Sequence, residues 1–204
     1  MFKAVVATKN AHKVRELEAL FAPFGEISLV TAKEMGFDKE IEENGTTFSE
    51  NAYIKAFETA KELGIPAFAD DSGLCVDVLD GAPGIYSARY ASKDGEGNST
   101  DEQNNQKLLN DLKDVPMEKR TAHYVCAMCL CFPDGRHIDS VGKCYGQILF
   151  EQRGNGGFGY DSMFYCPEHK KTYAEITAQE KNRISHRAKA VELICKQMKE
   201  QGII

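Results

Sequence analysis

The sequence predicts an α/β fold whose second half contains long antiparallel strands. In the first half, short apolar runs typical of buried strands alternate with stretches whose apolar residues recur at helical spacing. In the second half, an apolar run that ends at Phe132 is followed by an Asp-Gly turn at residues 133–136 and a return strand to about Phe150. The 204 residues are enough for one sizeable domain or two closely associated lobes.

The composition of the chain excludes some classes of function. Hydrophobic residues make up 42% and charged residues 27% of the chain, which is ordinary for a soluble globular protein. The net charge of −6 argues against non-specific binding to duplex nucleic acid, which needs a broad basic surface. No apolar run approaches the roughly 20 residues of a membrane-spanning helix. We therefore expect no nucleic-acid polymer and no membrane among the partners.

Seven cysteines lie scattered without the spacing of a disulfide framework, and no signal peptide is evident at the first residues. We therefore expect reduced thiols and a cytoplasmic protein. Cys126, Cys129 and Cys131 suggest zinc, but they fall in a predicted strand, where residues 126 and 129 would point to opposite faces. Buried thiols are the better interpretation.

The first strand and helix enclose a polar segment. Residues 2–7 form a β-branched run, and apolar residues recur at helical spacing from Val14 to a stop at residues 23–25. The segment Thr8 to Lys13 lies at the junction, where backbone N–H groups and the helix dipole can bind an anion. Asn10 can cap the helix and Lys13 can contact a phosphate. An ordinary capped helix with a solvated lysine fits the spacing equally well.

An acidic segment precedes the second helix. After a strand at residues 26–30, residues 33–46 are polar and contain Glu42 and Glu43. Thr47 and Glu50 form a capping box, and the helix ends at Gly64. Lys55 lies two turns into this helix, so it can point toward the acidic segment before it.

Two adjacent carboxylates follow a short buried strand. The run at residues 67–69 ends at Asp70 and Asp71, and a second apolar run begins at Leu74. Adjacent carboxylates at the end of a buried strand are costly unless a cation lies beside them. A polar loop and a Mg²⁺ site, which requires only one or two carboxylates, are both consistent with this pattern.

The remaining chain alternates polar loops and regular elements. Residues 92–100 are predicted to be a mobile polar loop, Thr100 opens a helix to about Lys113, and four glycines lie within residues 154–159. A capping box at residues 177–180 precedes a C-terminal helical stripe. Lys181, Ser185, His186 and Arg187 form a cationic cluster along it, which favours an anion or a purine carbonyl.

These segments together resemble the inosine triphosphate pyrophosphatase family. The match is in order and covers nearly the whole chain. The matching segments are ATKNAHK at 7–13, EENGTTFSENAYIKA at 42–56, ADDSGL at 69–74, GAPGIYSARY at 81–90, GGFGYD at 156–161 and ISHR at 184–187. The chain departs from the family where Lys9 and His12 replace common glycines, and where Ser162 and Met163 replace a proline and an aliphatic residue. We expect these changes to tune affinity without abolishing the chemistry.

The resemblance implies a fold, an activity and an assembly. The fold is an elongated mixed β-sheet flanked by helices, with two lobes of one domain (residues 1–204) and an active-site cleft between them. The activity is Mg²⁺-dependent hydrolysis of ITP, dITP and XTP to the nucleoside monophosphate and pyrophosphate. The assembly is a homodimer. A nucleotide pyrophosphatase of broader specificity and a nucleotide-binding sensor without turnover are the alternatives.

The resemblance also implies roles for individual residues. Asp71 is the expected general base, Phe158 stacks on the purine, and Lys181, His186 and Arg187 donate to its 6-oxo group and ring nitrogen. The expected catalytic residues are Asp71, Lys13, Lys55 and Asp70, and the expected metal ligands are Glu42, Glu43 and Asp71. The expected substrate-binding residues are Thr8, Lys9, Asn10, Ala11, His12, Lys13, Ser72, Phe158, Gly159, Tyr160, Asp161, Lys181, Ser185, His186 and Arg187.

Overall fold

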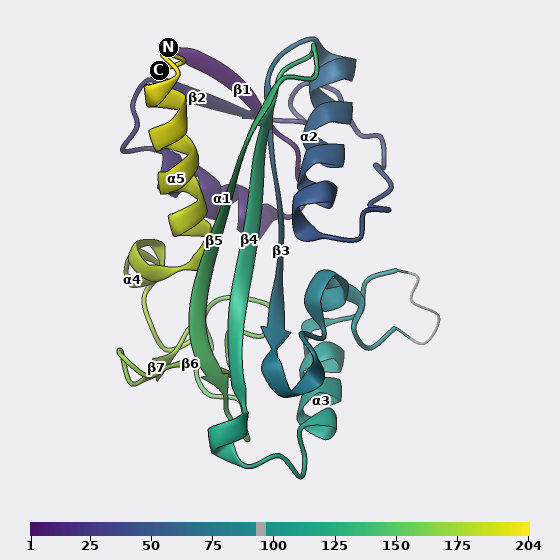
Figure 1. Cartoon of the computed structure of the whole chain (residues 1–204), viewed down its shortest axis with the longest axis vertical. Coiled ribbons are helices and arrows are strands. Elements are labelled where there is room, and N and C mark those ends of the chain that lie inside the picture. Colours follow the sequence, from purple (N-terminus) through teal and green to yellow (C-terminus); the bar gives the residue numbers. More distant parts are fainter. Residues whose placement is uncertain (93–96) are drawn as a thin grey trace. The chain divides into compact units, whose positions relative to one another are not determined.

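The computed structural model describes residues 1–92 and 97–204 and contains one mixed sheet (Figure 1). The middle of the predicted polar loop, residues 93–96, lies outside the described residues. The strand order is β2-β1-β3-β4-β5-β6-β7. Strand β1 pairs in parallel with β2 and β3, whereas β6 pairs antiparallel with β5 and β7. The predicted α/β class with antiparallel strands in the second half is confirmed.

The elements follow the sequence pattern closely in the first half of the chain. The strands are β1 Phe2–Val6, β2 Ile27–Thr31, β3 Ala67–Val76, β4 Thr121–Cys131, β5 His137–Ile148, β6 Phe164–Cys166 and β7 Lys171–Thr172. The α-helices are α1 Ala11–Phe21, α2 Phe48–Leu63, α3 Asp101–Asp111, α4 Ala178–Ile184 and α5 His186–Glu200. Short 3₁₀ turns occupy η1 Asp77–Leu79, η2 Gly84–Arg89 and η3 Met117–Lys119.

Two differences from the expected elements bear on function. The strand expected to end at Asp70 continues through both aspartates to Val76, because both carboxylates find cationic or amide partners within the fold. The C-terminal stripe is divided between α4 and α5 at Ser185, whose extended backbone and side chain cap α5. The short strand β7 carries no apolar run that could have predicted it.

The chain divides into two compact units whose boundaries fall within β3, β4 and β5. Unit 1 comprises residues 1–71, 126–142 and 185–204, and unit 2 comprises residues 72–125 and 143–184. In unit 1, apolar residues alternate along the strands between two cores. Ala4, Val6 and Phe68 pack with α1 and α5, whereas Ala7 and Ala69 pack with α2. Figure 1 shows α5 and α2 on opposite sides of the strands of this unit.

Unit 2 has its own core. Leu108 and Leu112 of the α3 region pack against strand residues that include Leu74 and Val76 of β3 and Ile148 of β5. The glycine-rich loop and α4 border this core through Tyr160 and Ile184 respectively. Unit 2 thus presents the glycine-rich segment on a fixed apolar base.

The predicted thiols are confirmed as free and mostly buried. All seven cysteines are free, and six of them are buried. Cys126 lies in the core with α1 and α5, whereas Cys129 and Cys131 lie in the core with α2, so the strand alternation separates the suspected zinc ligands. Within residues 1–92 and 97–204, no three acidic, histidine or cysteine side chains gather as a metal-binding group.

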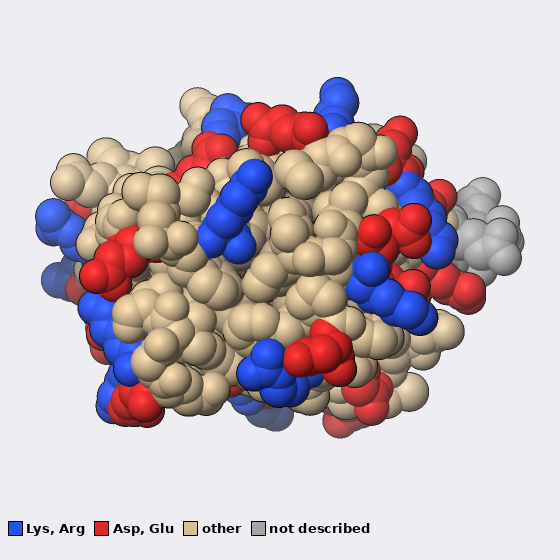
Figure 2. All heavy atoms as spheres, turned by 90° about the horizontal axis from the view of Figure 1, so that it is seen from above, with Lys and Arg blue, Asp and Glu red and all other residues tan. Residues whose placement is uncertain are grey.

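Figure 2 shows the charged side chains on one face of the molecule. On the face shown in Figure 2, basic and acidic side chains are interspersed, and the described residues there form no broad basic patch. A search of the described residues also finds no helix that meets the length and hydropathy needed to span a membrane.

Candidate active site

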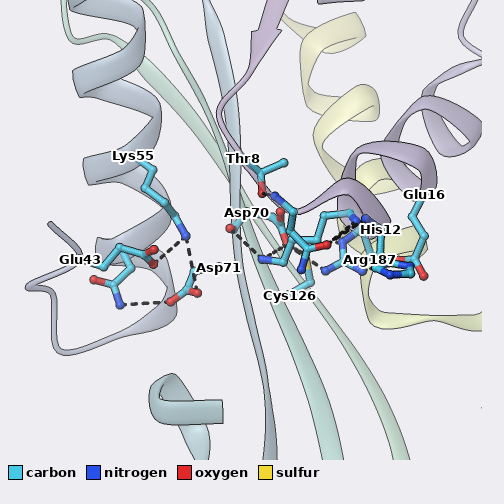
Figure 3. A network of polar contacts seen from close by, with 12 residues as sticks. Thr8, His12, Glu16, Glu43, Lys55, Asp70, Asp71, Cys126 and Arg187 are labelled. Carbon is cyan, nitrogen blue, oxygen red and sulfur yellow. Dashed lines mark hydrogen bonds and ion pairs between the residues drawn. The ribbon is translucent and has the colours of Figure 1, made fainter. Parts of the chain in front are cut away.

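The two adjacent aspartates of β3 face opposite sides of the strand. Asp70 continues the alternation of Phe68, which faces α1 and α5, and Asp71 continues that of Ala69, which faces α2. Both are buried, with exposed fractions of 1% and 8%. Figure 3 shows the resulting separation into two polar groups within unit 1. One carboxyl is therefore held by α1 and α5, and the other by α2.

Asp70 is enclosed by two cations. Its Oδ2 lies 3.1 Å from Lys13 Nζ of α1 and 3.0 Å from Arg187 Nη2 of α5. Arg187 Nη1 also pairs with Glu16, one turn after Lys13 on α1 (Figure 3). Burial disfavours the charged guanidinium, but Asp70 and then Glu16 outweigh it, so the pKa of Arg187 rises above its ordinary value. Arg187 is thus a fully buried ion-pair partner.

Asp71 is held by an amide and faces a lysine. Asn51 Nδ2 donates to Asp71 Oδ2 over 3.1 Å, and Lys55 Nζ lies 3.7 Å from Asp71 Oδ1. Lys55 Nζ also lies 2.7 Å from Glu43 Oε2, which confirms that this lysine points to the acidic segment. The Oδ1 of Asn51 accepts the N–H of Gly45 over 2.8 Å. Asn51 therefore connects the acidic segment to Asp71.

Burial sets the protonation of Asp71. Its pKa is raised, first by burial, and Lys55 and Lys13 oppose that rise. Glu43 adds to the rise, whereas Asn51 opposes it. Burial is the leading cause of the raised pKa of Asp71, and Asp70 is not among the main causes; its side chain points to the other face of the strand, where it pairs with Lys13 and Arg187. A raised pKa makes this carboxylate a better proton acceptor near neutral pH.

The first strand-to-helix junction is a capped helix start. Asn10 Oδ1 accepts the N–H groups of His12 and Lys13 over 2.9 and 3.2 Å, and Thr8 Oγ1 accepts the N–H of Asn10. These first-turn N–H groups are already satisfied by the cap. Lys9 pairs with Asp38 on the surface. An incoming phosphate would thus compete with the cap for these N–H groups, whereas Lys13 lies beside Asp70 and close to Asp71.

The predicted metal ligands form an oxygen donor set. Glu43 and Asp71 approach the same lysine amine from two sides, so their carboxylates already share one positive charge. Hard carboxylate oxygens are the ligands that Mg²⁺ takes, and it needs only one or two of them together with water and phosphate. Glu42 and Glu43 are both exposed, and Glu43 is the one that pairs with Lys55. Glu43 and Asp71 therefore fit a magnesium ion.

In unit 2, an aspartate organises the glycine-rich loop. Asp161 Oδ2 accepts the N–H of Phe158 over 3.0 Å and lies 2.7 Å from Lys181 Nζ. Lys181 Nζ lies 4.9 Å from the centroid of the Phe158 ring. Tyr160 is only 3% exposed and donates its hydroxyl to the Ser87 carbonyl over 2.8 Å. Phe158 is the half-buried aromatic of this loop, whereas Tyr160 belongs to the core.

The predicted cationic cluster has members in both units: Lys181 belongs to unit 2, and Ser185, His186 and Arg187 belong to unit 1. Lys181 lies on α4 and pairs with Asp161, whereas Arg187 lies on α5 and pairs with Asp70 and Glu16. Ser185 is buried and its hydroxyl accepts the N–H of Ala188. Lys181 and Arg187 thus each have an acidic partner within their own unit. The predicted donation of Lys181, His186 and Arg187 to a purine stays a prediction.

Two residues of the polar groups, Asn51 and Glu16, were not among the predicted site residues. Asn51 lies one helical turn before Lys55, and Glu16 lies three residues after Lys13, so each shares a helix face with a predicted catalytic lysine. That spacing is the signal that could have found them. The other predicted residues have these positions: Ala11 and His12 are exposed in the first turn of α1, Ser72 is half-buried on β3, Gly159 is half-buried in the glycine-rich loop, and His186 is buried at the start of α5.

Similar proteins of known sequence all point to one family. The Ham1 family model matches residues 4–197. The chain is 46% identical over 205 residues to the dITP/XTP pyrophosphatase of Geobacter sulfurreducens, covering 100% of both chains. It is 50% identical over 196 residues to that of Salmonella paratyphi A, covering 95% of this chain and 96% of the relative.

Solved structures of similar proteins have the same fold. A HAM1 protein from Coxiella burnetii superposes with a TM-score of 0.87 at 40% identity, covering 98% of this chain and 100% of that chain. The Ham1 protein of Staphylococcus aureus superposes with a TM-score of 0.84 at 37% identity, covering 98% and 99%. With the family match spanning nearly all residues, the chain belongs to the Ham1 family.

Proposed function

We propose that this chain hydrolyses dITP, ITP and XTP to the nucleoside monophosphate and pyrophosphate. The observation that carries the proposal is Asp71, a buried carboxyl that accepts a hydrogen bond from Asn51 and lies 3.7 Å from Lys55 Nζ. Identities of 46–50% to proteins named dITP/XTP pyrophosphatase support the substrate class. A triphosphate brings about four negative charges, which a chain of net charge −6 must meet with local cations.

Residues of unit 1 supply the general base, the cations and the metal ligands of the proposed reaction. Asp71 accepts a proton from the attacking water, and Asn51 orients its carboxylate through the 3.1 Å hydrogen bond. Lys13 and Lys55 offset negative charge on the phosphates and on the leaving pyrophosphate. Bound Mg²⁺ would add Lewis-acid stabilisation of that charge, and Glu43 and Asp71 would hold it. Asp70 and Arg187 fix Lys13 through their shared ion pair.

In unit 2, Phe158 offers a ring face to a purine and Lys181 offers an ammonium group. Oxopurines accept a hydrogen bond at their 6-oxo group, whereas the 6-amino group of adenine does not. A donor left unpaired in a buried site opposes binding, which explains discrimination against ATP. Rejection of GTP is not explained by the same donors, because guanine also carries a 6-oxo group.

A substrate panel tests the proposal. ITP, dITP, XTP, ATP and GTP are incubated with the protein in Mg²⁺ or in EDTA, and pyrophosphate and orthophosphate are assayed separately. We expect Mg²⁺-dependent pyrophosphate release from the first three. Equal rates on ATP or GTP would favour a broader pyrophosphatase, and binding without pyrophosphate release would favour a sensor. Orthophosphate as the main product would reject the proposed bond.

The role of Asp71 has its own test. Asp71→Asn keeps the shape of the side chain but removes the proton acceptor, so turnover should fall by roughly 10²–10⁴ with less change in KM. Asp134→Asn serves as the control because Asp134 is an exposed carboxylate of the β4–β5 turn. Turnover within a few-fold of the wild type in Asp71→Asn would reject Asp71 as the base.

The proposal includes a homodimer in the cytoplasm. The dimer rests on the family resemblance, and the location on seven free thiols, which suit a reducing compartment. Light scattering on the purified protein measures the mass directly. A mass of one 22.7 kDa chain at micromolar concentration would reject the dimer.

A further inference from the structure

We propose that Asn105 and Asp101 of α3 are positioning residues that fix the glycine-rich loop and thereby set nucleobase discrimination. The loop is residues 156–161, which carry Phe158. This inference rests on the proposed function for its kinetic consequence, but not for its structural one. All the groups involved lie within unit 2.

Both polar groups of Gly159 are held by one helix. Its N–H donates to Asp101 Oδ2 over 2.7 Å, and its carbonyl accepts from Asn105 Nδ2 over 3.2 Å. Gly159 has a φ of +63°, a conformation that favours glycine. Hydrogen bonds on both sides of this unusual backbone position hold the two peptide planes that flank Gly159. The peptide plane before Gly159 begins at Phe158, so the bonds limit where that ring can stand.

Asn105 is the stronger of the two holds. It is 3% exposed, and its amide group also donates to Gln152 Oε1 over 3.2 Å. Both contacts are donor-to-acceptor, which fixes the orientation of the amide. Asp101 is exposed at the first turn of α3, where its bond competes with water. Loss of Asn105 would remove the donor to the Gly159 carbonyl, whereas Gln152 Oε1 would keep the Ser162 hydroxyl as a donor over 2.8 Å.

Hydrogen bonds from other parts of unit 2 also fix the loop residues on either side of Gly159. The N–H of Phe158 donates to Asp161, and the hydroxyl of Tyr160 donates to the Ser87 carbonyl. Asp161 and Tyr160 are each 3% exposed, whereas Phe158 is half-buried. The loop therefore presents the Phe158 ring from a backbone anchored at three successive residues. Asn105 and Asp101 supply the middle anchor.

The neighbouring Asn104 provides a matched control. It is also 3% exposed, but its amide binds the Ala88 carbonyl over 3.2 Å and the Ala91 N–H over 2.9 Å. Asn104→Ala and Asn105→Ala thus remove the same side chain from the same helix. Only the second removes a bond to the glycine-rich loop. For Asp101, the control is Glu102→Ala, which removes the adjacent first-turn carboxylate and its 3.1 Å bond to Gln152 but leaves the bond between Asp101 and the Gly159 N–H in place.

The first test reports loop position without any enzyme activity. The chain contains no tryptophan, so Phe158→Trp introduces a single indole at the loop. Combined with Asn105→Ala or Asp101→Ala, this variant should show a red-shifted emission and at least about twofold greater acrylamide quenching, because the ring gains solvent access. Combined with Asn104→Ala, the emission should not change. Asp101→Asn keeps a carbonyl acceptor and should restore most of the Asp101→Ala change.

The second test measures discrimination. In the unmodified background, Asn105→Ala should lower the ratio of kcat/KM for dITP over ATP by about tenfold or more, mainly through a higher KM for dITP. Asn104→Ala should keep the ratio within about twofold even if it lowers the melting temperature equally. Asp101→Ala should lie between them, since its bond is exposed.

The outcomes separate the inference from the proposed function. Unchanged fluorescence and an unchanged ratio in Asn105→Ala, with a stability loss equal to that of Asn104→Ala, would overturn the positioning role. No hydrolysis of dITP by the wild type would reject the proposed function, and the fluorescence series would still decide whether α3 holds the loop. A fluorescence change with an unchanged ratio would overturn the assigned effect on discrimination.

Discussion

At Asp70, a carboxylate with almost no solvent exposure is stabilised by a guanidinium and an ammonium group. Such groups lose hydration on folding and remain charged only if their partners replace it. Arg187 supplies most of this replacement and also neutralises Glu16. The residue therefore contributes first to the stability of unit 1, whatever else it does for a ligand.

Arg187→Ala should strongly destabilise the protein. It leaves the buried Asp70 without its guanidinium, which costs about 3–5 kcal/mol of unfolding free energy when one partner of a buried pair is removed. Urea denaturation measures the loss. The exposed pair of Arg136 with Asp134 offers the control, since Arg136→Ala should change stability little. Equal stabilities of the two variants would contradict the buried-pair account.

This result changes how Arg187 can be used as a specificity probe. A loss of activity in Arg187→Ala would mix unfolding with any loss of base recognition. Arg187→Lys keeps a positive charge near Asp70 and is the better variant for measuring substrate ratios, although it cannot reproduce two forked contacts.

Helix α5 approaches β5 so closely that only glycine fits at position 142. A Cβ there would lie 2.1 Å from the His186 carbonyl oxygen and 2.6 Å from the Ala190 backbone nitrogen. Both neighbours are backbone atoms, which cannot rotate away. The first turn of α5, which carries Arg187, is therefore held at its present distance from the strand by the absence of a side chain.

Gly142→Ala should push α5 outward and cost roughly 1–3 kcal/mol, as overpacking of a core does. Turnover should fall with it, because Arg187 and Lys13 share Asp70. Gly25→Ala is the control, since a Cβ at Gly25 meets nothing within 4 Å. Its unfolding free energy should stay near that of the wild type. Crystal structures or urea curves in which the two variants behave alike would contradict this explanation.

The start of α2 predicts a pH dependence. Hydrogen bonds from Thr46, and then Thr47, hold the pKa of Glu50 below its ordinary value of 4.5. A carboxylate with a lowered pKa in the folded state adds stability above pH 4.5, and this stability is lost as pH falls through the folded-state pKa. Glu50→Gln should thus be less stable than the wild type at pH 7, with the difference shrinking as pH falls below 4.5 and vanishing below the folded-state pKa of Glu50. A pH-independent difference in urea denaturation would contradict this.

Within single helices and strands, features that depend on neighbouring residues could be predicted from the sequence. Contacts between residues far apart in the chain could not. The capping box of α2, the cap at Asn10 and the approach of Lys55 to Glu43 follow from short sequence spacings. The pairing of Arg187 with Asp70 joins residues 117 positions apart and depends on where two cores form. The break between α4 and α5 was hidden because Ser185 also fits a continuous helical stripe.

The opposite orientation of Asp70 and Asp71 could have been deduced from the sequence alone. Strand alternation requires it once β3 is known to continue, and the continuation was missed because two carboxylates in a buried strand are unfavourable without partners. Those partners come from α1, α2 and α5, which the sequence could not bring together. The site was therefore predictable in its residue types but not in its grouping.

For the whole molecule, burial predicts the reactivity of the thiols. Of seven free cysteines, only Cys75 is partly exposed, and burial raises its pKa. Native protein should expose at most one thiol to Ellman's reagent, reacting slowly at pH 7 and faster at pH 9 as the thiolate fraction rises. Seven should react in denaturant. Cys75→Ser should abolish the native reaction, and rapid modification of more than one native thiol would contradict the packing.

Unit 1 is assembled from three separate stretches of chain, and this has a consequence for synthesis on the ribosome. Asp70 and Lys13 emerge early, but the guanidinium that completes their ion pair emerges after all of unit 2. At about 5–20 residues per second, the 117 positions between Asp70 and Arg187 take several seconds to translate. Until residues 185–204 are made, Asp70 of a nascent chain can pair with Lys13 but not with Arg187. Unit 1 can therefore be completed only after that segment is released, while unit 2 has all its residues beforehand.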